Sequence, residues 1–222
     1  MYTAVIVEPR KHAALEFVLH NFLKNLSDDW VIMIFHGIDN IEYLYNIMSH
    51  MPRQYIQRIS LINMGIANLT RDEYSRMLTS EDFYNSIPTE TFLIFQTDAM
   101  IFADNKHLIN NFLQFDYVGA PWPHSSYVVG NGGLSLRKKS KMIEIIRTIP
   151  YAGESEDVYF CKQIAVPLYR PSAEEAKWFS VENIFAEKSF GCHQGWISYV
   201  RHPRSKYYND VFALRKLQYT NP

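Results

Sequence analysis

The sequence predicts an α/β domain with a mainly parallel central sheet flanked by helices. Its first half alternates between short apolar runs rich in β-branched residues and stretches whose apolar residues recur at helical spacing. Strands this apolar are covered on both faces, as in a doubly wound sheet. The length of 222 residues fits one domain of this kind.

The elements of the first half follow in order. Thr3–Val7 is a buried strand that stops at Glu8-Pro9, and Ala13–Leu26 has the apolar spacing of a helix. We expect further strands over 30–35, 59–63 and 91–95, and helices or helical turns over 41–48, 71–78 and 81–84. Ligands of such sheets bind at the carboxyl ends of the strands. Three segments follow strand ends: Glu8-Pro9-Arg10, His36-Gly37-Ile38-Asp39 and Gln96-Thr97-Asp98.

The second half is less regular. Asp116–Trp122 is aromatic and contains proline, and Val128–Arg137 is a glycine turn followed by an alternating strand. We expect helices over 138–148 and 155–164, a strand over 179–185 and a loop over 190–196. No repeat or linker separates the halves, so both belong to one domain.

Composition excludes several classes of protein. The net charge is −1, without the strong positive field of a nucleic-acid binder. The two cysteines, Cys161 and Cys192, are too few for a disulfide framework and suit a reducing compartment. The sequence has no signal-peptide pattern and no run near the ~18 apolar residues of a membrane span. We therefore expect a cytoplasmic protein.

Asp98 is the first candidate for chemistry. It follows the predicted strand 91–95, where a divalent cation could bridge the protein and a diphosphate. Mg²⁺ and Mn²⁺ favour carboxylate oxygen and often keep several waters. An Asp after a strand is also a common turn or helix-capping residue, so Asp98 gains weight only from its companions.

Gly130-Asn131-Gly132-Gly133 is the second candidate. Consecutive glycines permit positive φ and let another molecule approach the backbone closely, which favours a turn that faces a sugar. The alternative is a simple hairpin turn, because Asn-Gly is a strong hairpin signal. A Walker phosphate loop is excluded, since no Lys-Ser/Thr follows at its spacing.

Two further segments carry titratable groups. Glu156 and Asp157 begin a predicted helix behind Ser155, where Ser155 could cap the helix and acidic residues stabilise its N-terminus. One of the two acids could instead be a general base. His193 is a possible ligand of a Mn²⁺-type site, although a lone histidine is usually structural. No second Cys/His pair lies at zinc-ligand spacing.

Taken in order, these segments resemble GT-A fold glycosyltransferases, and in particular an uncharacterised microbial and giant-virus family of glycosyltransferase-like proteins. The order is also similar, more distantly, to fringe-like β-1,3-glycosyltransferases, which carry an Asp-x-Asp metal motif, a Gly-Gly strand, an E-D-V segment and a late metal-binding histidine. The shared features are FQTD-x-x-IF, DYVGAPW, VGNGGLSLR, EDVYF and FGCH-x-x-W, at 95–102, 116–122, 129–137, 156–160 and 190–196.

The resemblance implies roles for individual positions. Asp98 corresponds to the last Asp of the metal motif and His193 to the late histidine, with Mn²⁺ or Mg²⁺ as the cofactor. Gln96 stands where the first Asp would be, which leaves one carboxylate where relatives have two. Asp157 corresponds to the catalytic base. Glu156 is the second choice, because it is better placed to cap the helix.

The resemblance also implies substrates. The donor would be a UDP- or GDP-sugar, and the acceptor a glycan or protein hydroxyl. The single domain, residues 1–222, would divide into a nucleotide-binding half (1–104) and an acceptor and catalytic half (105–222). The donor would contact Glu8, Pro9, Arg10, Gln96, Thr97 and Asp98, and the donor sugar would meet the acceptor at Trp122, Asn131, Gly132 and Gly133.

The implied reaction is a direct, inverting displacement with Asp157 as base; a retaining enzyme would use the same metal site without that base. Two other functions stay open. A nucleotidyltransferase shares the sheet and the metal carboxylate, but usually has a Gly-rich basic loop where this chain has Glu8-Pro9-Arg10-Lys11. A non-catalytic sugar or nucleotide binder is favoured by the missing first Asp.

Overall fold

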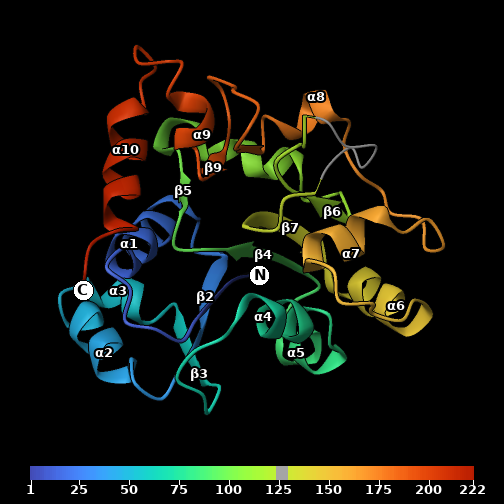
Figure 1. Cartoon of the computed structure of the whole chain (residues 1–222). Helices are drawn as coiled ribbons and strands as arrows, with labels where there is room; N and C mark the ends of the chain where they lie inside the picture. Colours follow the sequence, from blue (N-terminus) through green and yellow to red (C-terminus); the bar gives the residue numbers. More distant parts are fainter. Residues whose placement is uncertain (124–129) are drawn as a thin grey trace.

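A six-stranded sheet in the order β3-β2-β1-β4-β7-β6 lies at the centre of the protein (Figure 1). It is seen in a computed structural model, which describes residues 1–123 and 130–222. β1 pairs in parallel with β2 and β4, and β2 with β3, whereas β7 is antiparallel to both of its neighbours. The predicted α/β class with a mainly parallel sheet is confirmed. The strands are β1 (Tyr2–Glu8), β2 (Trp30–His36), β3 (Ile59–Asn63), β4 (Thr91–Phe95), β6 (Tyr117–Val118) and β7 (Leu134–Lys138).

Helices cover both faces of this sheet. Alternate residues of β1 show the two layers: Ala4 and Ile6 pack with α1 and α2, and Val5 and Val7 pack with α4 to α7. None of the helices in the described ranges is long and apolar enough to span a membrane. The helices are α1 (Leu15–Asn25), α2 (Ile41–Ser49), α3 (Arg53–Ile56), α4 (Arg71–Leu78), α5 (Glu81–Ser86), α6 (Lys139–Thr148), α7 (Glu156–Lys162), α8 (Ala173–Ala176), α9 (Trp196–Tyr199), α10 (Tyr208–Leu217) and the 3₁₀ helix η1 (Ala103–Asn111).

A second, three-stranded sheet in the order β5-β9-β8 joins segments that are far apart in the sequence. β5 (Ala99–Ile101) directly follows the β4 turn and pairs antiparallel with β9 (Gly191–His193). β9 in turn pairs in parallel with β8 (Ser180–Val181). This small sheet therefore brings the residue before β5 next to the last residue of β9.

Two predictions for the second half are wrong. The segment 190–196 is not a loop, because Gly191–His193 forms β9 and α9 begins at Trp196. The strand expected over 179–185 is limited to Ser180–Val181. Strands of two and three residues are too short to leave a periodic pattern in the sequence.

The strand after the glycine turn also differs from the expectation. Leu134 to Arg137 are all buried, so the polar residues of this alternating strand do not face solvent. Arg137 is fully buried and bonded to Ser135 on the same face. Val128 and Val129, the start of the predicted segment, lie outside the described residues.

Candidate active site

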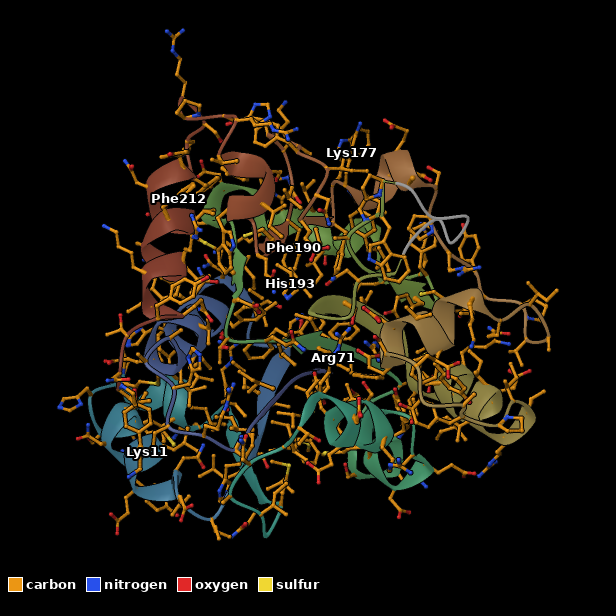
Figure 2. All side chains as sticks on the ribbon, in the orientation of Figure 1. Lys11, Arg71, Lys177, Phe190, His193 and Phe212 are labelled. Carbon is orange, nitrogen blue, oxygen red and sulfur yellow. The ribbon has the colours of Figure 1, made fainter. Side chains whose placement is uncertain are left out.

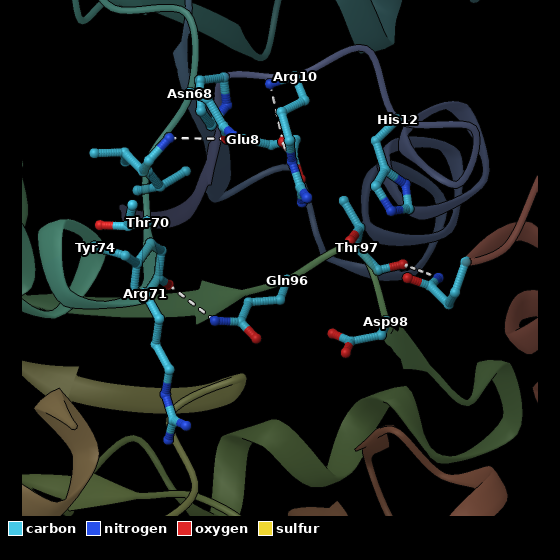
Figure 3. A pocket seen from close by; sticks show the side chains of 14 residues that line it. Glu8, Arg10, His12, Asn68, Thr70, Arg71, Tyr74, Gln96, Thr97 and Asp98 are labelled. Atoms are coloured by element: carbon cyan, nitrogen blue, oxygen red, sulfur yellow. Dashed lines mark hydrogen bonds and ion pairs between the residues drawn. The ribbon is translucent and has the colours of Figure 1, made fainter. Parts of the chain in front are cut away.

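Two adjoining cavities open at the carboxyl edge of the parallel strands. The first has a volume of about 410 Å³, and Figure 3 shows the side chains that line it. Its walls include Glu8 from the end of β1 and Asp98 from the turn after β4. All six residues expected to contact the donor line this cavity: Glu8, Pro9, Arg10, Gln96, Thr97 and Asp98.

The second cavity has a volume of about 430 Å³ and lies on the side of β7 and α7. It is lined by the glycine turn and the start of α7, which supplies Asp157. The two cavities share Arg71, Tyr74 and Gln96 as lining residues. They are therefore two compartments of one cleft.

Asp98 and His193 meet where the compartments join. Asp98 precedes β5 and His193 ends β9, and Ala99 pairs with His193 in the register of the small sheet. Asp98 Oδ1 lies 3.2 Å from His193 Nε2, and Figure 2 shows His193 near the centre of the molecule. The resemblance implied that Asp98 and His193 are ligands of one metal ion, and the structure places the two side chains next to each other.

Glu182 flanks the other side of the His193 ring. It follows β8, and its Oε1 lies 3.2 Å from His193 Nδ1 and accepts a hydrogen bond from Asn131 Nδ2 at 3.1 Å. The imidazole therefore stands between two carboxylates. Glu182 could not be predicted as a partner of His193, because it lies in the segment 179–185, which was expected to be an ordinary strand.

The two carboxylates determine the protonation state of His193. Burial lowers the pKa of His193, but Asp98 and Glu182 outweigh it and raise the pKa to about 10. Burial would raise the pKa of Asp98, yet His193 and the hydrogen bond from Gln194 lower it. The ring nitrogens are at ion-pair distance from the carboxylates without the alignment of hydrogen bonds. Asp98 and His193 thus form a charged pair in this structure.

Gln194 holds the pair in place. Its backbone N–H and its side-chain Nε2 both donate to Asp98, each at 2.9 Å. Gln194 has φ 46°, a left-handed conformation that is uncommon for a residue other than glycine. The strained residue therefore lies directly at the meeting point of Asp98 and His193.

The glycine turn packs closely against the side chains of His193 and Glu156. A Cβ on Gly133 would lie 2.2 to 2.6 Å from atoms of the His193 ring, and a Cβ on Gly132 would lie 2.1 Å from Glu156 Oε1. These glycines are required because protein side chains occupy the space beside them. Neither has positive φ. The alternative of a simple Asn-Gly hairpin turn is also wrong. The antiparallel strands β6 and β7 are joined by residues 119–133, and the backbone N–H groups of Gly130 and Asn131 donate to the Ala120 carbonyl.

Glu156 and Asp157 have different surroundings. Glu156 is buried and ion-paired with fully buried Arg137, at 2.9 Å from Nη1 and 3.1 Å from Nη2. Burial raises the pKa of Glu156, against the lowering by Arg137. The expectation that Glu156 caps α7 is therefore wrong. Asp157 lines the second cavity and accepts hydrogen bonds from the backbone N–H groups of Gly132 and Val158.

The expected cap at Ser155 is also absent from the structure. Its side chain makes no capping hydrogen bond to α7, and its hydroxyl instead accepts a bond from Arg71 Nη2 at 2.9 Å. Arg71 begins α4, so this contact crosses the cleft from one wall to the other.

Two expected residues lie outside the cleft. Trp122 lines neither cavity and packs its ring against Gly130, since a Cβ there would lie 2.5 Å from Trp122 Cη2. His36 is buried and lines neither cavity, and Gly37 packs against Pro9. Sequence analysis missed several lining residues, because they lie outside the motifs or, for Gln194, at a variable position of one: His12, Asn68, Thr70, Arg71, Tyr74, Gln194 and Gln218.

The family model of the protein of unknown function DUF5672 matches residues 58–193. The chain belongs to the DUF5672 family. The matched region of this DUF5672 protein ends at His193 and contains Gln96 to Asp98, the glycine turn, Asp157 and Glu182, whereas Glu8 to Arg10 lie outside it. No curated protein sequence matches the chain.

Two of the solved structures with a similar fold are glycosyltransferases. The galactosyltransferase LgtC, in complex with donor and acceptor sugar analogs, superposes with a TM-score of 0.55 at 10% identity, covering 99% of this chain and 97% of that one. The glycosyltransferase GlyE of Streptococcus pneumoniae TIGR4 superposes with a TM-score of 0.50 at 12% identity, covering 94% of this chain and 50% of that one. The likeness establishes the fold of the DUF5672 chain as GT-A.

The donor set at the junction fits a hard divalent cation that also binds a ligand. Asp98 Oδ1 and His193 Nε2 are buried and adjacent, and neither has a hydrogen-bond partner among the described residues. Carboxylate oxygen and imidazole nitrogen are donor types that Mn²⁺ accepts, and His193 would release its proton when the cation binds. The described residues contain no cluster of three or more metal-binding side chains. A cation at this place would therefore need ligand oxygens and waters to complete its coordination.

Proposed function

We propose that this protein transfers a sugar from a nucleoside diphosphate sugar to an acceptor hydroxyl. The observation that carries the proposal is the two-compartment cleft, with the Asp98–His193 pair at the junction and Asp157 in the second compartment. The nucleoside, of UDP or GDP, would occupy the first compartment. The sugar and the acceptor, a glycan or protein hydroxyl, would meet in the second.

Asp157 is the base in this proposal. It takes the proton of the acceptor hydroxyl while that oxygen attacks the anomeric carbon, and the bond from this carbon to the diphosphate oxygen breaks. The nucleoside diphosphate leaves with the bonding electrons, and the displacement inverts the anomeric configuration. Glu156 is unsuited to the role, because Arg137 occupies both of its carboxylate oxygens.

Asp98 and His193 would hold Mn²⁺ or Mg²⁺ at the diphosphate. A bound cation would supply positive charge where the leaving group becomes more negative. Glu182 orients the His193 ring, so that Nε2 faces Asp98. Gln96 cannot act as a second anionic ligand, and its amide donates to the Tyr74 hydroxyl instead.

A thermal-shift screen with UDP, GDP and their sugars, with and without Mn²⁺, tests the proposal. A ligand at 100 times its Kd stabilises the folded state by ~2.7 kcal/mol, which corresponds to a shift of ~5–11 °C for a chain of this size. Product analysis then decides the reaction. Release of nucleoside diphosphate supports transfer or hydrolysis. Conversion of the nucleotide sugar and added pyrophosphate into nucleoside triphosphate and sugar 1-phosphate shows a nucleotidyltransferase, and binding without turnover shows a binder.

A further inference from the structure

Arg71 occupies a bridging position in the cleft. It begins α4, lines both compartments and reaches Ser155 on the opposite wall at 2.9 Å. Tyr74 lies three residues further along α4 and also lines both compartments, so one face of this helix looks onto the junction. Figure 3 shows Gln96 between Arg71 and Asp98.

The other basic side chains that line the cleft are either paired with carboxylates or neutral. Arg10 binds Glu8 through its backbone N–H, Nε and Nη2. His193 stands between two carboxylates, and burial lowers the pKa of His12. Among the described residues, Arg71 is the one arginine or lysine lining the cleft without a carboxylate partner. Its guanidinium is therefore available to an anion.

The surroundings favour a phosphate group as that anion. A guanidinium presents paired N–H donors that match phosphate oxygens. Gln96 is neutral and its amide donates to the Tyr74 hydroxyl, so the side chain that Figure 3 shows between Arg71 and Asp98 carries no negative charge. A diphosphate there would meet a fixed positive side chain on one side and the cation-binding pair on the other.

We propose that Arg71 binds the diphosphate of the donor. Its positive charge would add to that of a cation which, in this site, Asp98 would hold as the single carboxylate ligand. The inference rests on the proposed function. The Ser155 hydroxyl is the resting partner of the guanidinium and holds it across the cleft before the donor arrives. Arg71 is thus a ligand-binding residue and not a structural ion pair.

Isothermal titration with inorganic pyrophosphate, UDP and GDP, each with Mg²⁺, tests this role without knowledge of the sugar. The variant is Arg71→Gln. The matched control is Arg76→Gln, since Arg76 lies on the same helix, is exposed and lines neither cavity. Because hydrogen bonds between charged groups are strong, Arg71→Gln is expected to weaken pyrophosphate and nucleoside diphosphate binding at least about tenfold. Arg76→Gln should leave it within about twofold.

Two further arms separate the possible outcomes. Uridine and guanosine, which lack phosphate, should bind the wild type and Arg71→Gln equally, and Arg71→Lys should recover part of the lost affinity. Nucleoside diphosphate binding that is unchanged in Arg71→Gln, or lost equally in Arg76→Gln, overturns the role of Arg71 alone. A wild-type protein that binds neither nucleoside diphosphates nor pyrophosphate overturns the proposed function together with this inference.

Discussion

The neighbouring acids of α7 should separate into a structural and a catalytic residue. In Glu156→Gln, the fully buried guanidinium of Arg137 loses its only charged partner among the described residues. Breaking a buried pair from one side costs ~3–5 kcal/mol. At ~2–4 °C per kcal/mol for a chain of this size, the melting temperature should fall by ~6–20 °C.

Asp157→Asn should behave in the opposite way. Its side chain is partly exposed in the cleft, and asparagine keeps one carbonyl oxygen for the backbone N–H groups that Asp157 now binds. We expect a stability loss of ~1 kcal/mol and a fall in sugar transfer of ~10²-fold or more, with donor affinity nearly unchanged.

Thermal unfolding and donor turnover, measured on both variants, decide between these outcomes. Glu156→Gln should transfer sugar at a near-normal rate below its own melting temperature. If Glu156→Gln melts like the wild type but is inactive, while Asp157→Asn is active, the two roles are exchanged. If both folded variants remain active, neither carboxylate is the base, and the inverting mechanism fails with them.

Three other substitutions test the junction of the cleft. Asp98→Ala should abolish the Mn²⁺-dependent part of nucleotide binding while the protein stays folded, and unchanged affinity in a folded variant would remove Asp98 from the site. Glu182→Gln should weaken Mn²⁺ binding ~10–100-fold, because the orienting partner of the His193 ring loses its charge; titration of Mn²⁺ in the presence of UDP or GDP measures this, and an unaltered affinity refutes the orienting role. Gly133→Ala should force the His193 ring to move, since the new methyl would lie within 2.6 Å of three ring atoms. We expect a loss of ~1–3 kcal/mol on unfolding together with weaker Mn²⁺ dependence, and a variant that keeps wild-type values for both would show that the turn yields easily.

The regular elements of the first half were predictable because they carry strong periodic patterns. β3 and β4 begin and end at the predicted residues, and α1 and α2 differ by one or two residues at their ends. β4 is buried on both faces, whereas β3, at the edge of the sheet, is only partly buried, and an apolar run identifies both strands. The position of Asp98 at a strand end followed from the same pattern.

The second half was harder because tertiary packing determines it. Arg137 lies in an alternating strand that reads as half exposed, yet α7 covers its polar face and Glu156 neutralises the charge. Glu182 meets His193 only through the pairing of two very short strands. The bridging position of Arg71 depends on how α4 approaches Ser155, just before α7. No local pattern encodes such distant pairings, so these residues could be found only in three dimensions.

Gln218, which directly follows α10, lines the first compartment, and this contact affects how the cleft forms during folding. Gln218, just after α10, lines that cavity and donates a hydrogen bond of 2.8 Å to the Thr97 carbonyl, a partner 121 positions earlier in the chain. A contact between such distant positions must close a long loop, which delays it during folding. The first compartment would therefore be completed only after the segment that contains Gln218 has been synthesised and has folded back onto Thr97. Since Gln218 directly follows α10 and lines the cavity, an occupied cavity should slow amide hydrogen exchange at the end of α10, where ligand binding would be measurable far in sequence from Asp98.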